Sequence, residues 1–264
     1  MELQKLLSKA RRACEDYRMI AEGDRIAVGL SGGKDSTTLL AILAAMRRFY
    51  PAKYDLCAIT VDMGLGTDER ETEAMKAFCE SLSVPYEIEQ TRIGELIFDV
   101  RKETNPCSLC ANMRRGALNN AALRLGCNKV ALGHHADDLA DTLFLSLFYE
   151  GRFSVFSPVT PLERSGLTVI RPMIFIREKE IAGYSKQNPV IHNPCPADKH
   201  TQRQYIKDML NDLKKDIPFL KHRIHGAITH PERNNLFDKC LIYKTAPAGK
   251  LPETNKTDDD KSLN

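Results

Sequence analysis

A glycine-rich polar segment near the start of the chain has the composition of an anion-binding loop. Ser31-Gly32-Gly33-Lys34-Asp35-Ser36 follows the apolar run Ile26–Leu30 and precedes a stretch with the composition of a helix. Glycines let backbone amides approach an anion, and the start of a helix adds its positive end. The spacing is not that of the Walker loop. We expect the segment to bind a polyphosphate, although a plain turn that caps the helix through Asp35 or Ser36 is the alternative.

A second polar cluster follows a later apolar segment. Gly133-His134-His135-Ala136-Asp137-Asp138 comes directly after Val130–Leu132, and Asp62 ends another apolar segment. If these segments are parallel strands, their ends lie along one edge of a sheet, where ligands bind. Asp137 and Asp138 are suited to bring Mg²⁺ to phosphates, and either histidine to hydrogen-bond a phosphate or to move a proton. An aspartate before an apolar helix also serves simply as a cap.

Cysteines form a third candidate site. Cys107 and Cys110 are separated by two residues, so both thiolates can face one metal, and Cys195 stands alone between two prolines. Zinc would need a fourth ligand, for which His192 and Asp198 are candidates, whereas three cysteines also suit an iron–sulfur cluster with one open iron. Spacing alone leaves both metals open. Four other cysteines are expected to be buried as small apolar side chains, and Cys240 to be a bystander: Cys14, Cys57, Cys79 and Cys127.

Alternating strands and helices must position these groups. The apolar patterns predict strands near residues 26–30, 56–61, 86–89, 130–132 and 167–170, with helices near 1–20, 34–50, 68–82, 107–126, 138–148 and 201–217. Loops are expected at 151–166 and 188–196, and Pro218 is expected to start or kink a further helix. This alternation predicts an α/β fold with a doubly wound, mainly parallel sheet.

The chain divides into four expected parts. Residues 1–22 form an N-terminal helix, 23–200 the main domain with the glycine-rich loop and the cysteines, and 201–245 a helical C-terminal extension. Residues 246–264 are polar and lack apolar periodicity, so we expect a disordered tail. With 264 residues, of which 42% are apolar, the chain is long enough to bury a substantial core.

Charge and apolar runs limit the possible partners and location. The net charge is only +3, but residues 101–129 carry six basic and one acidic residue, and 199–225 carry seven and three. Such blocks favour an anionic partner, although they also occur simply on solvated helix faces. The longest apolar run, Leu39–Met46, is too short to span a membrane, and no secretory signal is apparent. Eight sparse cysteines then favour a reducing, cytoplasmic setting.

These motifs together resemble known families. The segment 31–36 resembles the pyrophosphate loop (PP-loop) of the N-type ATP pyrophosphatases, and the ordered set resembles the tRNA 2-thiocytidine-forming sulfurtransferases. The matching pieces are 31–36, 107–110 with 114–116, 132–135 with 137–138, 170–172 with 177–179, Cys195 before 202–204, and 235–238. The resemblance spans roughly residues 1 to 240. The sequence departs from the family at Asn193-Pro194-Cys195-Pro196, where a second Cys-x-x-Cys is common.

The resemblance implies a dimeric enzyme that uses ATP and Mg²⁺ and holds a [4Fe-4S] cluster on Cys107, Cys110 and Cys195. ATP would adenylate O2 of a cytidine in the tRNA anticodon loop, and sulfur from a cysteine desulfurase or from sulfide would replace it. The basic blocks would hold the tRNA backbone. In the loop, backbone amides and two hydroxyls would hold pyrophosphate, and Lys34 would balance its charge.

We therefore assign residues to two roles. The catalytic set is Cys107, Cys110, Cys195, Lys34 and Asp35. The cofactor-binding set is Ser31, Gly32, Gly33, Lys34, Asp35, Ser36, Asp62, Gly133, His134, Asp137 and Asp138. The assignment requires the phosphate loop and the cysteines to face one chamber.

Two other functions fit parts of the sequence. One is a cluster-free, ATP-dependent tRNA-modifying ligase of the lysidine type, in which zinc is bound by the cysteines. The other is a non-catalytic RNA-binding protein that keeps the nucleotide fold only as a scaffold. The intact glycine-rich loop argues against the second.

Overall fold

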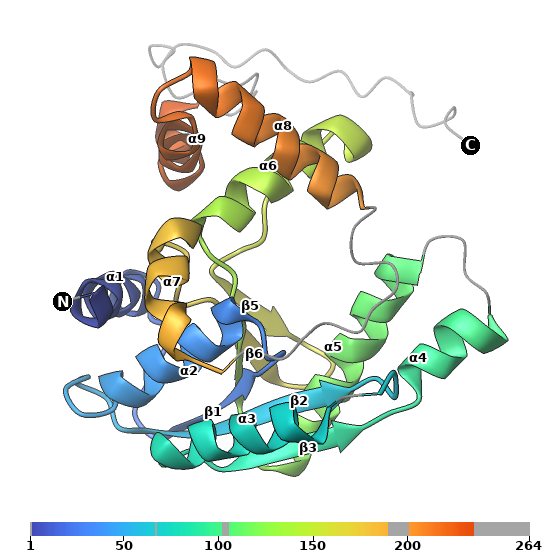
Figure 1. Cartoon of the computed structure of the whole chain (residues 1–264). Coiled ribbons are helices and arrows are strands. Elements are labelled where there is room, and N and C mark those ends of the chain that lie inside the picture. The colour runs from blue at the N-terminus through green and yellow to red at the C-terminus, as the bar shows by residue number, and fades with distance from the viewer. Residues whose placement is uncertain (1, 67, 102–105, 190–200, 235–264) are drawn as a thin grey trace, which may run out of the picture.

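The computed structural model describes residues 2–66, 68–101, 106–189 and 201–234 (Figure 1). Six strands form one sheet in the order β3-β2-β1-β4-β6-β5, and every neighbouring pair is parallel except β5 and β6. The strands are β1 (Asp24–Gly29), β2 (Tyr54–Asp62), β3 (Tyr86–Gln90), β4 (Lys129–Ala131), β5 (Val159–Leu162) and β6 (Leu167–Ile170). The mainly parallel sheet expected from the sequence is confirmed.

Helices connect and cover these strands. They are α1 (Glu2–Asp16), α2 (Lys34–Met46), α3 (Glu69–Ser81), α4 (Ile93–Glu95), α5 (Pro106–Arg124), α6 (Ala136–Glu150), α7 (Glu178–Tyr184), α8 (Gln202–Asp216) and α9 (Leu220–Thr229). A π-helical turn, Leu96–Val100, continues α4, and short 3-10 turns follow at Ser185–Gln187 and Pro231–Arg233. Within the residues that the structure describes, no helix combines the length and the apolar character needed to cross a membrane.

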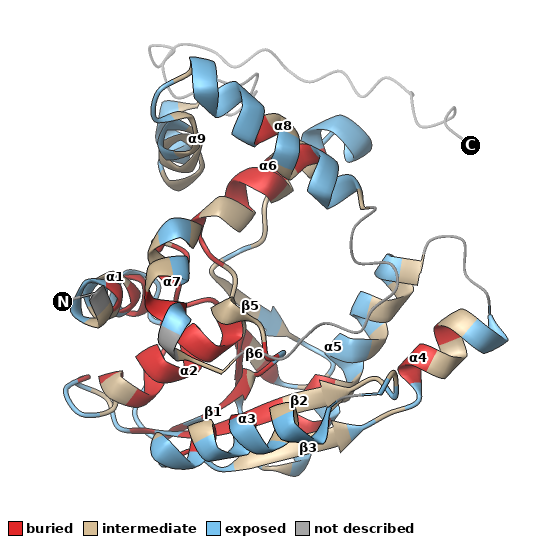
Figure 2. Cartoon of the chain, viewed as in Figure 1, coloured by how far each residue is buried: buried red, intermediate tan, exposed pale blue. Residues whose placement is uncertain are grey.

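Strand side chains alternate between two cores on opposite faces of the sheet. On β1, Ile26 and Val28 are buried with residues of α1, α2, α3 and α7, whereas Ala27 is buried on the other face with α5. On β2, Leu56 and Ala58 follow the first pattern and Cys57 and Ile59 the second. This alternation is the period of two expected of a strand covered by helices on both faces. Figure 2 shows the buried residues along β1 and β2.

Two peripheral parts pack differently. Leu6, Ala10 and Cys14 of α1 are buried in the same core as α2 and α7, so the first helix packs against the main domain. A third, smaller core joins Ala140 of α6 to Ile206 and Leu210 of α8. Through this core the C-terminal helices α8 and α9 pack against α6 and lie apart from the sheet (Figure 1). The expected tail, 246–264, lies outside the described residues.

The structure differs from the sequence expectation in three elements. The expected loop 151–166 contains β5, which pairs antiparallel with β6 across a turn that includes Gly166 at a φ of 72°. The helical segments 93–100 and α7 also have no counterpart in the expected elements. All three are short, and β5 contains Pro161, so local sequence favours a loop and pairing with β6 supplies the strand.

Candidate active site

The glycine-rich loop joins the end of β1 to the first turn of α2. Gly32 has a φ of 77°, a conformation that glycine adopts without strain. Helix α2 has Gly33 as its N-cap, with no side-chain hydrogen bond to its first amides. The alternative in which Asp35 or Ser36 caps this helix is therefore wrong. Ser36 Oγ instead donates to the Gly33 carbonyl oxygen at 3.0 Å and lies 3.2 Å from Ser31 Oγ. The first helical amides remain suited to an anion.

The end of β4 passes very close to this loop at Gly133. A Cβ atom added there would lie 3.1 Å from the carbonyl carbon of Asp35 and 3.2 Å from the nitrogen of Ser36. Such contacts with backbone atoms are tighter than ordinary packing, so a side chain at this position would push the loop away by a few tenths of an ångström. Gly133 therefore lets the two polar segments found in the sequence meet.

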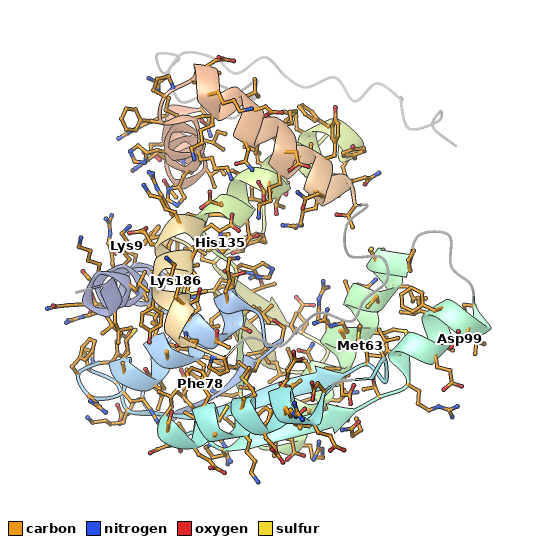
Figure 3. The ribbon with its side chains drawn as sticks, in the orientation of Figure 1. Lys9, Met63, Phe78, Asp99, His135 and Lys186 are labelled. Atoms are coloured by element: carbon orange, nitrogen blue, oxygen red, sulfur yellow. The ribbon has the colours of Figure 1, made fainter. Side chains whose placement is uncertain are left out.

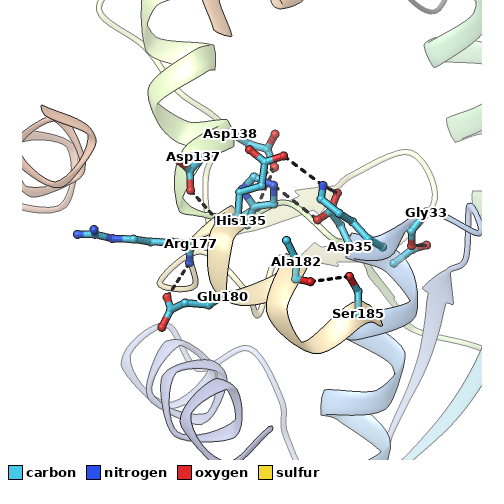
Figure 4. Close-up of polar contacts among 12 residues, drawn as sticks. Gly33, Asp35, His135, Asp137, Asp138, Arg177, Glu180, Ala182 and Ser185 are labelled. Carbon is cyan, nitrogen blue, oxygen red and sulfur yellow. Dashed lines mark hydrogen bonds and ion pairs between the residues drawn. The ribbon is translucent and has the colours of Figure 1, made fainter. Parts of the chain in front are cut away.

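Residues after β4 face the phosphate loop (Figure 4). His135 is 4% exposed, and its Nε2 lies 3.7 Å from Asp35 Oδ1, while its Nδ1 lies 3.5 Å from Asp138 Oδ2. Asp138 Oδ2 also accepts a hydrogen bond from the His135 amide at 2.9 Å, so it does cap α6. Asp35 Oδ1 and His135 Nδ1 are buried and have no hydrogen-bond partner among the described residues. Asp35 lines the cavity beside the loop, so its Oδ1 atom is suited to a bound group.

His134 and Arg171 sit beside Phe156 at the same edge. The His134 ring centroid is 4.8 Å from that of Phe156, and burial lowers the pKa of His134 to about 4, so the imidazole is neutral at pH 7. Arg171 directly follows β6 and is 9% exposed, with Nη1 donating to the Ser157 carbonyl oxygen. It pairs with no described carboxylate. No role for Arg171 is predicted from the sequence, although its place directly after a parallel strand is the available signal.

A carboxylate on α7 holds the lysine of the loop. Lys34 Nζ lies 3.0 Å from Asp35 Oδ2 and 3.2 Å from Glu178 Oε1, and Lys207 Nζ lies 2.8 Å from the same Glu178 oxygen. Burial opposes ionisation of Glu178, but the two lysines outweigh it and lower its pKa to about 2. Asp137 is likewise engaged, because Lys221 Nζ lies 3.1 Å from its Oδ1.

A cavity of about 440 Å³ opens beside the phosphate loop. Its polar lining includes Ser31, Asp35, Ser36, Arg114, Arg115, Asn119, His134, Asp138 and Arg203, with Gly133 beside them. Its apolar lining includes Leu30, Ile59, Val61, Leu118, Val130, Leu132 and Val169. The cavity has the two surfaces that a nucleotide needs, one for its phosphates and one for its base.

The cysteine pair lines a second cavity of about 480 Å³. Cys107 and Cys110 lie in the first turns of α5, one turn apart, and Cys110 Sγ is 3.6 Å from Met63 Sδ. Figure 3 labels Met63, which follows β2. Cys195 lies outside the described residues, as do His192 and Asp198, and the described part of the chain holds no group of three metal-binding side chains. The two thiols fit a thiophilic metal group that takes further ligands from elsewhere.

The two cavities share part of their lining. Ala111, Arg114, Asp138 and Arg203 line both the phosphate-loop cavity and the cysteine cavity. The cavity lined by Cys107 and Cys110 therefore adjoins the phosphate-loop cavity at these four residues.

Asp62 lies in a different place. Ile59 and Val61 of β2 line the phosphate-loop cavity, whereas Thr60 and Asp62 line a separate cavity of about 360 Å³ beside α3. Since successive strand side chains point to opposite faces, the last residue of β2 points away from the loop. Asp62 Oδ1 accepts a hydrogen bond from the Gly64 amide at 2.9 Å.

The remaining described cysteines are buried as expected: Cys14, Cys57, Cys79 and Cys127. Cys57 Sγ and Cys127 Sγ lie 3.3 Å apart, in the core between the sheet and α5. Cys240 lies outside the described residues.

Comparison with known proteins identifies the family. The PP-loop domain family matches residues 2–213. The chain belongs to this PP-loop family. It is 37% identical to the tRNA-cytidine(32) 2-sulfurtransferase of Syntrophotalea carbinolica, over 90% of this chain and 93% of that protein. The corresponding sulfurtransferase of Geobacter metallireducens is also 37% identical, over 90% and 94%.

A solved structure of a tRNA-modifying enzyme is also similar to this chain. The U34-tRNA thiolase NcsA of Methanococcus maripaludis, determined with its [4Fe-4S] cluster, superposes with a TM-score of 0.67. It is 25% identical and covers 88% of this chain and 81% of that chain. This PP-loop chain is therefore a member of the tRNA-cytidine 2-sulfurtransferase group by sequence, with the fold of a tRNA thiolase.

Proposed function

We propose that this PP-loop protein is an ATP-dependent tRNA sulfurtransferase that converts a cytidine of the anticodon loop to 2-thiocytidine. The observation that carries the proposal is the lining that the two cavities share at Ala111, Arg114, Asp138 and Arg203. Activation of a base by ATP and delivery of sulfur must occur at one carbon atom. A nucleotide cavity that adjoins two thiols meets that requirement.

The reaction needs two displacements. O2 of cytosine is a very poor leaving group, so it first attacks the α-phosphate of ATP and releases pyrophosphate. A sulfur nucleophile at the hydrosulfide level then adds to C2 and expels AMP, and loss of the sulfur-bound proton leaves the C=S bond. In the first step the amides that begin α2 and the Ser31 and Ser36 hydroxyls hold pyrophosphate, and Lys34 offsets its charge.

Carboxylates of the loop region are suited to Mg²⁺. Asp35 Oδ1 is buried without a hydrogen-bond partner among the described residues, and Asp138 lines the same cavity. Hard oxygen ligands are those that Mg²⁺ prefers, usually beside substrate phosphates. His134 lines the cavity and is proposed to hydrogen-bond the α-phosphate. His135, the alternative for this role, is absent from that lining and contacts Asp35 and Asp138 instead. Asp62 and Asp137 stay proposals for a wider ligand set, since Asp62 lines another cavity and Asp137 pairs with Lys221.

The cysteines are proposed to hold a [4Fe-4S] cluster, as NcsA does. Cys107 and Cys110 supply two thiolates from one face of α5, and Cys195 is the proposed third ligand. Such a cluster, when bound, supplies an iron coordination position that the protein leaves open for sulfur. Around it Arg114 and Arg203, which line both cavities, favour anionic sulfur and phosphate groups.

The partners follow from this reaction. The substrate is tRNA, whose target base must leave the stacked loop to enter the cavity, and exposed Arg114 and Arg115 of α5 are suited to its phosphates. Sulfur comes from a cysteine desulfurase or from sulfide. We further propose a homodimer and a cytoplasmic location.

The decisive experiment is anaerobic turnover followed by mass spectrometry of nucleosides. Iron-loaded protein, ATP, Mg²⁺, sulfide and tRNA from cells that lack the protein are expected to give 2-thiocytidine, with one AMP and one pyrophosphate per modified base. No 2-thiocytidine under these conditions overturns the proposal. A colourless protein with stoichiometric zinc, no iron and amine incorporation would indicate the lysidine-type ligase. tRNA binding that ignores both ATP and Lys34→Ala would indicate the RNA-binding scaffold.

A further inference from the structure

Asn119 of α5 lines the phosphate-loop cavity and has an unused hydrogen-bond acceptor. The residue lines that cavity together with Ser31, Asp35 and Ser36. Its Oδ1 atom is buried and receives no hydrogen bond from any described residue. A buried carbonyl oxygen without a donor is costly, and a ligand in the adjoining cavity could supply that donor. The next residue, Asn120, is exposed.

The wall around Asn119 is apolar and close to the loop. A Cβ atom added at Gly29 would lie 3.0 Å from Leu118 Cδ2 and 3.2 Å from Leu132 Cδ2, so both leucines crowd the end of β1. Gly29 stands two residues before Ser31. Ile59 and Val61 of β2 extend the same apolar lining. A flat aromatic ring bound here would therefore lie next to phosphates held by the loop, as a nucleotide base must.

A hydrogen-bond acceptor at the edge of a bound purine distinguishes adenine from guanine. Adenine carries the exocyclic N6 amine, a donor, where guanine carries the O6 carbonyl, an acceptor. We infer that Asn119 Oδ1 accepts a hydrogen bond from the N6 amine of adenine and thereby sets a preference for ATP over GTP. This inference rests on the proposed function, because it assumes that the cavity holds the nucleotide that the loop binds.

The N4 amine of the target cytidine has the same chemistry. The nucleotide is favoured because Asn119 lines the cavity of the phosphate loop and is absent from the lining of the cysteine cavity, where sulfur would be delivered. The two sources are separable, because binding of a nucleotide can be measured without tRNA.

The test compares two ligands that differ in one amine. α,β-Methylene ATP and the α,β-methylene triphosphate of purine riboside, which lacks the N6 amine, are titrated with Mg²⁺ against the iron-loaded, full-length protein. We expect the wild-type protein to bind the ATP analogue about tenfold more tightly. Asn119→Leu is expected to lose that factor for the ATP analogue and to bind the purine riboside analogue unchanged. α,β-Methylene GTP is expected to bind Asn119→Leu at least as tightly as wild type. Asn120→Leu, the matched control, is expected to match wild type with all three ligands.

Three results would overturn the inference. The first is a wild-type protein that binds both analogues equally, a measurement that does not depend on how any variant folds. The second is an equal loss for both analogues in Asn119→Leu, which would indicate disturbed packing. The third is an Asn119→Leu protein whose KM for tRNA is raised while its nucleotide binding is unchanged. This result would assign the acceptor to the target cytidine. In all three cases 2-thiocytidine formation by wild type would still stand. Wild-type protein that binds no nucleotide would overturn both this inference and the proposed function.

Discussion

Lys34 Nζ lies 3.2 Å from Glu178 Oε1, the same oxygen that lies 2.8 Å from Lys207 Nζ. Through this one carboxylate the phosphate loop is connected both to α7 and to α8, whose residues Arg203 and Lys207 line the cysteine cavity. A polyphosphate that enters the loop therefore competes with Glu178 for the lysine. We therefore expect ATP binding to weaken the contact between Lys34 and Glu178.

Glu178 should make stability depend on acid pH. Its pKa is about 2 in the folded protein and near 4.5 when unpaired, so its stabilisation is complete above pH 4.5 and is lost as the pH falls towards 2. We expect Glu178→Gln to lower the free energy of unfolding at pH 7 by on the order of 1–3 kcal/mol, a range that allows for solvent screening. The difference from wild type should shrink steadily between pH 4.5 and pH 3.

Urea unfolding at pH 7, 5, 4 and 3 measures this difference. Glu163→Gln, which changes an exposed glutamate, is the control and should follow wild type at each pH. A Glu178→Gln protein that loses as much stability in acid as wild type would contradict the assignment.

Gly133 should be intolerant of even one methyl group. In Gly133→Ala the new Cβ would press on the backbone of Asp35 and Ser36, so the loop must shift. We expect a loss of about 1–3 kcal/mol in stability and at least tenfold weaker ATP binding. Gly116→Ala is the matched control, because nothing lies within 4 Å of a Cβ there and alanine favours a helix. Isothermal titration with ATP measures the affinity of both variants, and thermal unfolding measures their stability. Equal affinity and equal stability in the two variants would refute the prediction.

The cysteine site should separate sulfur transfer from nucleotide binding. Cys107→Ala, Cys110→Ala and Cys195→Ala are each expected to abolish 2-thiocytidine formation and to reduce bound iron to background. ATP binding should persist, because Cys107 and Cys110 line the neighbouring cavity rather than the one at the phosphate loop. Cys240→Ala serves as the control. Full activity in any one of the three variants would remove that cysteine from the mechanism.

Arg115 should contribute to tRNA affinity without selecting sequence. It is exposed on α5 and lines the phosphate-loop cavity, so Arg115→Ala should weaken tRNA binding at low salt. The slope of log affinity against log salt should fall by about 0.7 to 0.9 for each phosphate that the variant no longer neutralises. Arg70→Ala on α3, also exposed, is the control. Filter binding of tRNA between 50 and 300 mM KCl measures this slope. An Arg115→Ala protein with the same slope as wild type would show that Arg115 neutralises no phosphate.

Local patterns in the sequence predict most of the fold. The run Ile26–Leu30 and the glycines after it predict β1, the loop and α2, because a buried parallel strand and a helix start both depend on nearby residues. The β5 strand depends on its partner β6, and Pro161 within it favours a loop, so it was not predictable locally. The same holds for α7, which has only seven residues.

The candidate site was predictable where it follows strand ends. Ser31, Asp35, Ser36, Gly133, His134 and Asp138 meet in one cavity, because β1 and β4 are neighbours in a parallel sheet. Asp62 does not join them, since one residue of register on β2 decides the face to which a side chain points. The contact between Lys34 and Glu178 joins segments distant in sequence, and no local pattern encodes it.

Helix α5 carries Cys107 and Cys110 in its first turns and Asn119 further along the same rod. With a rise of about 1.5 Å per residue, nine residues of helix fix roughly 13 Å between Cys110 and Asn119. The helix thus fixes the distance between the thiols and the cavity beside the phosphate loop, because movements of loops do not change the length of a helix. One residue inserted between Cys110 and Asn119 would advance the far end of the helix by about 1.5 Å and rotate it by about 100°, which would turn Asn119 away from the phosphate-loop cavity.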